Sequence, residues 1–337
     1  MERTKGIKAA LPYFVVILLL HIIGVVFLMI GGASHPLIIG MGVVAYTLGL
    51  RHAFDADHIA AIDNTVRKLL EQQRNSMGVG FYFSLGHSTV VFLMAVMLGL
   101  AVHWAQSHLA GFQSTGGLIG TLVSGFFLLL IGLLNLVILI QLIQLSRKLK
   151  YEEIGESQIN ELIESRGLIM RFVGPLFQFI NQSWHVFPLG FLFGLGFDTA
   201  SEVSLLALSA GASQHTVPFL GIIALPILFA SGMSLLDTLD GVFMTNAYHW
   251  AFERPARKLF YNMTMTAISV IAAIVIGGIE IIQLIGEKQH WDHGFLGWLT
   301  QLDFGWLGYI LVIVLILSWL IALLVWKVGH FEEKWGA

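Results

Sequence analysis

The chain has 337 residues, of which 56% are hydrophobic and only 12% charged, and its mean hydropathy is +0.80. Soluble domains carry about twice this share of charged residues, so the composition predicts a membrane protein. The chain contains no cysteine, which excludes disulfides and thiolate metal sites. Its net charge of −3 gives no information about partners, and the sequence has no basic patch that would favour nucleic-acid binding.

Apolar stretches long enough to cross about 30 Å of hydrocarbon occur eight times along the chain. The first is longer than the core of a cleavable signal, which has about 7–15 residues, so it is predicted to be a retained helix. The fold class is predicted to be an all-α integral membrane protein with about eight transmembrane helices, in a single polytopic domain over residues 1–337. The predicted spans are approximately residues 11–31, 36–62, 77–103, 116–146, 184–211, 217–247, 259–286 and 304–327.

Lysine and arginine are distributed unevenly over the segments between these spans. With the N-terminus inside, 16 of the 18 basic residues fall in cytoplasmic segments, Lys288 lies outside and Arg51 lies within a span. This asymmetry predicts that both termini are cytoplasmic, in the cytoplasmic (inner) membrane. The one long cytoplasmic loop is predicted at about residues 147–171, and its charge run is interpreted as a solvated segment.

Two short similarities relate the second and third spans to the fifth and sixth. Residues 54–58 (FDADH) resemble residues 197–202 (FDTASE), and residues 84–88 (SLGHS) resemble residues 231–234 (SGMS). Because the matching helices lie three apart, they cross the membrane in opposite directions. This pattern predicts an inverted repeat with a binding site between its halves, near mid-depth.

Ionisable side chains are concentrated in four of the predicted spans, where an aspartate or arginine facing lipid costs at least about 2.5–3.5 kcal/mol. We therefore expect these side chains to face each other, water or an ion. Two have simpler interpretations, Arg51 as an i, i+4 partner of Asp55 and Asp63 as a cap at the helix end. The candidates for a metal site are His52, Asp55, Asp57, His58, His87, Asp198, Glu202, Asp237 and Asp240.

The spacing within the second span decides which of these groups can share an ion. His52, Asp55 and His58 form one stripe on an ideal helix, whereas Asp57 lies about 140° from His52. For Asp57 to join the two histidines around one ion, the helix must be distorted locally, or Asp57 must support the ligands or act on a neighbouring helix. Two imidazoles with carboxylates suit nickel, cobalt or zinc better than magnesium or calcium.

His87 in the third span and Met233 in the sixth are further potential ligands. His87 follows Gly86, which permits close helix approach, and it is interpreted either as a ligand or as a partner that supports the ligands. Met233 is interpreted as a gap-filling core residue in preference to a sulfur ligand.

The run from Arg51 to Asn64, RHAFDADHIAAIDN, resembles the HXXXXDH signature of the nickel/cobalt transporter (NiCoT) family of secondary permeases. Three further segments resemble that family's other motifs: LGHSTVV at 85–91, LGFDTASE at 195–202, with Ser201 where threonine is expected, and GMSLLDTLDG at 232–241. The resemblance implies eight helices with cytoplasmic ends, uptake of Ni²⁺ or Co²⁺, and His52, Asp57 and His58 as essential residues. It also implies that the path is completed or supported by His87, Asp198, Glu202, Asp237 and Asp240.

The expected partners are the metal substrate and the lipid bilayer, with no cofactor. The sequence has no GXXXXGK(S/T) motif, so an ATP-driven scheme would require another subunit, for which there is no sign. An inward-negative potential moves a dication favourably by about 4.6 kcal/mol per 100 mV, so we expect alternating access without obligatory proton coupling.

Two alternatives to uptake remain. Nickel and cobalt exporters often carry a histidine-rich cytoplasmic loop, and the loop at 147–171 contains no histidine, which favours uptake. HXXXXD is also a pattern of membrane acyltransferases, but these need a basic phosphate-binding motif that is not found here. An intramembrane metal hydrolase, which needs only three protein ligands and a water molecule, is the less favoured enzyme alternative.

Overall fold

The computed structural model describes residues 3–33, 35–100, 118–137, 180–195, 218–252, 255–289, 293–302 and 308–317, with a few isolated positions between them. Within these residues all regular structure is helical. Five helices are long and apolar enough to cross a membrane, or six if one bent pair is counted as a single span. The prediction of an all-α, multi-pass membrane protein is therefore confirmed.

The helices coincide with the apolar runs because backbone groups in hydrocarbon must form their hydrogen bonds within the segment. Pro255 stands first in its helix, where its missing N–H costs nothing. The helices are α1 (Arg3–Gly32), α2 (Leu37–His52), α3 (Ala56–Glu71), α4 (Val79–Leu100), Leu118–Val137, the 3₁₀ turn η1 (Ser183–Val186), α8 (Phe187–Phe193), α10 (Phe219–Phe252), α11 (Pro255–Gln289), α12 (Gly294–Thr300) and Gly308–Leu317.

Each of the eight predicted spans overlaps a helix in the structure. The second span differs most, because it forms two helices, α2 and α3, which are bent by 53° relative to each other. The fifth and eighth are represented by the shorter apolar helices Ser183–Phe193 and Gly308–Leu317, so eight full crossings stay a prediction. The predicted loop at 147–171 lies outside the described residues.

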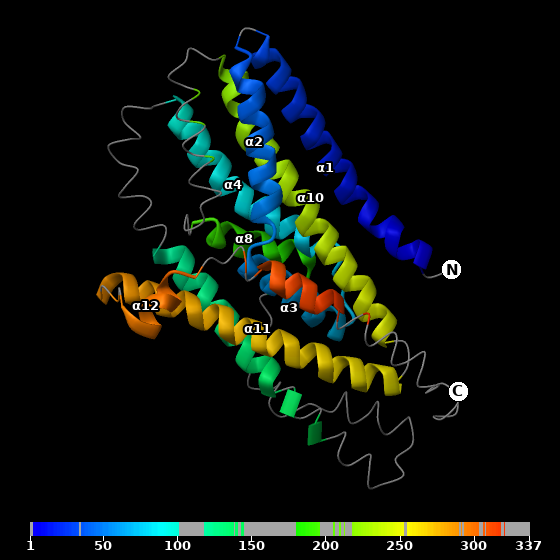
Figure 1. Cartoon of the computed structure of the whole chain (residues 1–337). Helices are drawn as coiled ribbons and strands as arrows, with labels where there is room; N and C mark the ends of the chain where they lie inside the picture. Colours follow the sequence, from blue (N-terminus) through cyan, green and yellow to red (C-terminus); the bar gives the residue numbers. More distant parts are fainter. Residues whose placement is uncertain are drawn as a thin grey trace.

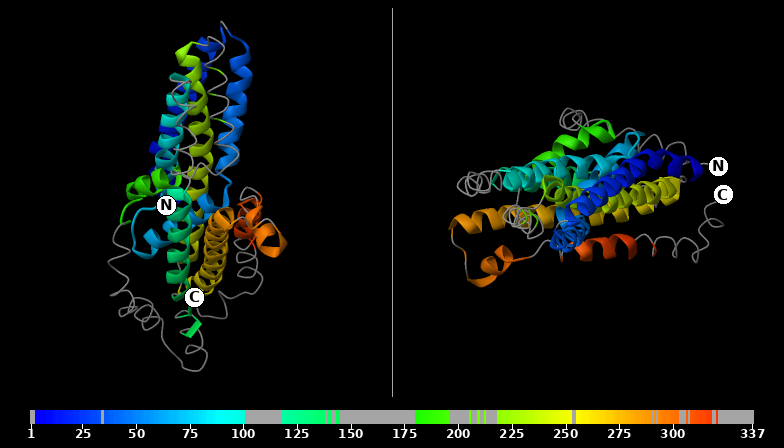
Figure 2. Two further views of the ribbon diagram at one scale, coloured as in Figure 1. Left: turned by 90° about the vertical axis from the view of Figure 1, so that its left-hand side faces the viewer. Right: turned by 90° about the horizontal axis from the view of Figure 1, so that it is seen from above.

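Helix α10 is the centre of the bundle, and it packs against α1, α2, α3 and α4 (Figure 1). Glycines allow the closest of these contacts: a Cβ at Gly49 of α2 would overlap the carbonyl group of Phe229, and one at Gly80 of α4 would overlap that of Asp237. Seen from the side, α2 and α4 lie along the first half of α10, and α11 crosses the opposite half of the molecule (Figure 2).

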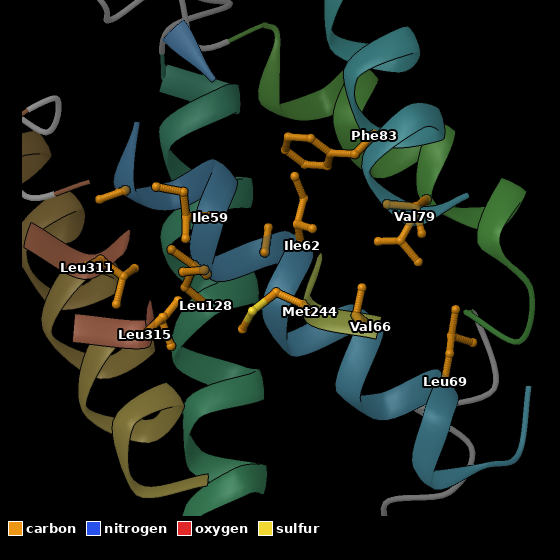
Figure 3. Close-up of a cluster of buried hydrophobic side chains, with 14 of the residues drawn as sticks. Ile59, Ile62, Val66, Leu69, Val79, Phe83, Leu128, Met244, Leu311 and Leu315 are labelled. Carbon is orange, nitrogen blue, oxygen red and sulfur yellow. The ribbon is translucent and has the colours of Figure 1, made fainter. Parts of the chain in front are cut away.

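Two clusters of buried apolar side chains occupy the two halves of this bundle. The α3 cluster lies around α3, the start of α4, and the second half of α10 (Figure 3). Its members include Ala56, Ile59, Ile62, Val66, Leu69, Val79, Phe83, Leu128, Phe193, Met244, Tyr248 and Leu315. The second cluster, called the α2 cluster, lies around α2 and the first half of α10. Its members include Leu28, Ile38, Ala45, Ala53, Val91, Ile222, Leu225, Leu228, Phe229 and Met233.

Candidate metal site

The break between α2 and α3 falls within the motif that the sequence singles out. Helix α2 ends at His52, and α3 begins at Ala56, with Asp55 in an extended conformation at its N-cap (φ −65°, ψ 139°). A local distortion was expected only if Asp57 joined His52 and His58 around one ion, because His52 and His58 already share one stripe of an ideal helix. The bend turns His58, in the first turn of α3, back toward the end of α2.

Three histidines from three helices meet at this break. Nε2 of His52 lies 2.8 Å from Nε2 of His87 on α4, and the ring centroids of His52 and His58 are 4.6 Å apart. The centroids of His58 and His87 are 4.7 Å apart. Each of the three rings offers one ligand nitrogen, and these three nitrogens all lie within 4.8 Å of one another. Two nitrogens bound at right angles to one ion, each at about 2.1 Å, would lie about 3 Å apart. The trio therefore has the dimensions of a metal site.

Two carboxylates flank the histidines. Asp55 Oδ2 is 2.7 Å from His52 Nδ1, and Asp237 Oδ2, from α10, is 3.5 Å from His58 Nδ1. A carboxylate close to Nδ1 can hold the proton there and leave the Nε2 lone pair for a metal, which is how protein metal sites commonly orient their histidines, and Asp55 is close enough to His52 for this role. Asp237 forms no hydrogen bond with His58 Nδ1. Three neutral imidazoles and two ionised carboxylates would together carry a charge of −2, opposite to that of a divalent cation.

The cluster is buried and has unused hydrogen-bonding capacity. His52, His58 and His87 are 1%, 0% and 3% exposed. Neither Nε2 of His58 nor Oδ1 of Asp237 has a hydrogen-bond partner among the described residues. Buried polar atoms without partners are rare and call for an explanation. Binding of a partly dehydrated cation would explain why these atoms have no partner.

The other candidate residues are not part of the three-histidine set. Asp57 lies in the first turn of α3, is half-buried and contributes no atom to the histidine set. Asp240 is one turn beyond Asp237 on α10 and is also half-buried. Asp198 and Glu202 lie outside the described residues. Met233 accepts a hydrogen bond from the Ser88 hydroxyl, at 3.5 Å, within the α2 cluster, as a gap-filling residue would.

The interpretation of Asp63 as a helix cap is wrong. Asp63 lies in the middle of α3, only 2% exposed, and its two oxygens accept hydrogen bonds from Tyr248 of α10 (2.8 Å) and Ser269 of α11 (2.6 Å). It therefore joins three helices. The error arose because the helix was expected to end near residue 62, whereas α3 continues to Glu71.

Sequence reasoning missed one buried carboxylate altogether. Glu280 of α11 is 3% exposed and accepts a hydrogen bond from Ser124, at 2.9 Å. A signal was available, because Glu280 is the only charged residue between Lys258 and Glu287, in the seventh predicted span. By the cost argument applied to the other spans, such a residue must face protein.

Comparison with known proteins gives a consistent result. A family model described as NicO, high-affinity nickel-transport protein, matches residues 38–325. The chain is 62% identical over 326 residues to a nickel transporter, NixA, of Staphylococcus aureus, covering 97% of this chain and 96% of that protein. It is 50% identical to the high-affinity nickel-transport protein NixA of Helicobacter pylori, covering 95% and 98% of the two chains. It is 40% identical to the cobalt transport protein NhlF of Rhodococcus rhodochrous, covering 91% and 89%. No solved structure matches the chain.

Proposed function

Because the chain belongs to the NicO family of high-affinity nickel-transport proteins, we propose that it carries Ni²⁺, Co²⁺ or both across the membrane that its helices span. The matched proteins are transporters, which excludes the acyltransferase and hydrolase alternatives. The observation that carries the proposal is the buried set of His52, His58 and His87 at the junction of three helices. Nitrogen ligands of this kind suit late first-row metals.

In the proposed site the three imidazoles bind the ion directly. Asp55 orients His52, and Asp237 either orients His58 or adds an oxygen ligand, because its Oδ1 has no hydrogen-bond partner among the described residues. Asp57 and Asp240 lie beside this set, and with Asp198 and Glu202 they are assigned to the path by which the ion arrives and leaves. These roles rest on the family motifs and on the charge that a dication requires.

The proposed direction is uptake, with both termini in the cytoplasm. The distribution of lysine and arginine supports this orientation. The membrane potential then moves the dication inward by about 4.6 kcal/mol per 100 mV, enough for a gradient of roughly three decades. Export would have to move the dication against this membrane potential.

The test is accumulation of radiolabelled Ni²⁺ and Co²⁺ by proteoliposomes holding the purified chain under an imposed inward-negative potential. Saturable uptake that H52A abolishes supports the proposal. Failure of the intact chain to move either ion, in liposomes where it is correctly folded, would refute it. Transport that occurs only out of the compartment facing the termini would show that the direction is wrong.

A further inference from the structure

The histidine trio lies at the junction of the two apolar clusters. Helix α10 contributes Phe229 and Met233 to the α2 cluster, Met244 and Tyr248 to the α3 cluster, and Asp237 between them. The break after His52 divides the motif in the same way, with Ala53 in the α2 cluster and Ala56 in the α3 cluster. The site is therefore bounded by packed apolar side chains along the bundle in both directions.

Each cluster places one phenylalanine ring against the imidazoles. The Phe229 ring, from the α2 cluster, lies 5.6 Å from the His52 ring, centroid to centroid, at an angle of 36°. The Phe83 ring, from the α3 cluster, lies 4.8 Å from the His58 ring at an angle of 84°. Both phenylalanines are 0% exposed.

The two rings approach from opposite directions. Phe229 precedes Asp237 by eight residues on α10, which is about 12 Å along the helix axis. Helix α4 runs antiparallel to α10, because Ser84 bonds Ser234 while Gly80 contacts Asp237. Phe83, one turn before His87 on α4, therefore lies at the Asp237 end of the site, where its ring also packs on Phe193.

We propose that Phe229 and Phe83 are the two gates of the metal site, each closing it from one side of the membrane. This inference rests on the proposed function. A partly hydrated dication cannot pass through packed apolar rings, so an ion reaches or leaves the histidines only when one ring moves. In the proposed orientation Phe229 closes the external side and Phe83 the cytoplasmic side. With both rings seated and the ligands buried, this structure represents the occluded state.

The cysteine-free chain suits a test by chemical accessibility, since a single introduced thiol is the only one present. Ser234 lies between Phe229 and Asp237, is 1% exposed and bonds Ser84, so S234C reports from the level of the site. The probe is a charged, membrane-impermeant methanethiosulfonate, applied to intact cells or to inside-out vesicles. S88C on α4, beside Met233, is a second reporter if S234C impairs folding.

In the S234C background we expect F229A to raise the modification rate from outside at least about tenfold, because the closed gate loses the ring that fills it. F83A should raise the rate by a similar factor only from the cytoplasmic face. F229L and F83L, which keep much of the apolar volume and fold more readily, should give smaller changes of the same sidedness. F127A is the matched control, since Phe127 packs on Phe193 in the same half of the protein, and it should change neither rate.

Equal acceleration from both faces, or no acceleration from either, would overturn the gate assignment. Uptake of radiolabelled Ni²⁺ by the otherwise unsubstituted S234C or S88C chain is measured in parallel. If modification is accelerated from one side only but no metal is taken up, the proposed function is refuted, whereas the assignment of Phe229 and Phe83 as closures of the two sides still holds. Uptake without side-specific accelerations would refute the gates alone.

Discussion

His52 and His87 are 35 positions apart in the sequence, yet their Nε2 atoms lie 2.8 Å from each other. The His58 ring lies beside both, with its centroid 4.6 Å from that of His52 and 4.7 Å from that of His87. Two neutral imidazoles can share one proton at this distance, and a cation between them would use both lone pairs. The pair brings the third predicted span into contact with the HXXXXDH motif.

Substitution of any histidine of the trio should abolish high-affinity uptake. H52A, H58A and H87A each remove a ligand, and we expect affinity to fall by more than the roughly 10–100-fold that follows loss of a residue supporting a ligand. The measurement is initial uptake of radiolabelled Ni²⁺, normalised to the amount of protein in the membrane. H21A is the control, because His21 bonds Ile17 and Tyr46 in α1 and α2. Normal accumulation by H58A would remove His58 from the site.

Asp55 should act through His52. D55N retains an oxygen that can accept from His52 Nδ1 but loses the charge, whereas D55A loses both, so we expect roughly 10-fold and 100-fold weaker metal binding, respectively. Binding is followed by titration calorimetry of the detergent-solubilised protein. If the two variants abolish binding equally, Asp55 is a ligand in its own right.

Metal binding should weaken as the pH falls toward about 6, because a protonated imidazole has no lone pair to donate. The affinity for Ni²⁺ is measured between pH 5.5 and 7.5 at constant ionic strength. A flat profile would contradict imidazole ligation.

The contacts of Asp63 predict a role in stability. D63A removes a buried carboxylate that joins α3 to α10 and α11, and leaves the hydroxyls of Tyr248 and Ser269 without this acceptor. We expect a loss of about 1–3 kcal/mol in the free energy of unfolding, and about 1 kcal/mol for Y248F. Thermal unfolding in detergent ranks the stabilities of the variants. A D63A protein as stable as the parent would contradict the role of Asp63 in joining the three helices.

Two glycines make a matched pair for the helix contacts around the site. A Cβ at Gly86 would overlap the Phe187 carbonyl group, so G86A should push α8 away from α4 and lower both stability and uptake. Gly278 of α11 has nothing within 4 Å of the same position, and G278A should be neutral or gain about 0.5–1 kcal/mol in helix stability. The readouts are thermal unfolding and Ni²⁺ uptake. Equal effects of the two substitutions would show that the α4–α8 contact is unimportant.

The sequence by itself determined the class of protein and the approximate positions of its long helices. Runs such as 217–247 are visible because hydropathy is a local property, and the bilayer forces such runs to be helical. The expectation that Asp57 could share an ion with His52 and His58 only on a distorted helix, and would otherwise support the ligands or act on a neighbouring helix, also came from local geometry, since an ideal helix separates Asp57 from His52 by about 140°. The four motifs were enough to indicate the family.

The tertiary structure alone decided which of these groups meet. The direction of the 53° bend, the approach of His87 to His52, and the choice of Asp237 as the partner of His58 all depend on contacts between helices far apart in the sequence. Asp63 was misassigned for the same reason, because its partners Tyr248 and Ser269 are about 200 residues away. Hydropathy and spacing describe one helix at a time, whereas packing selects which faces touch.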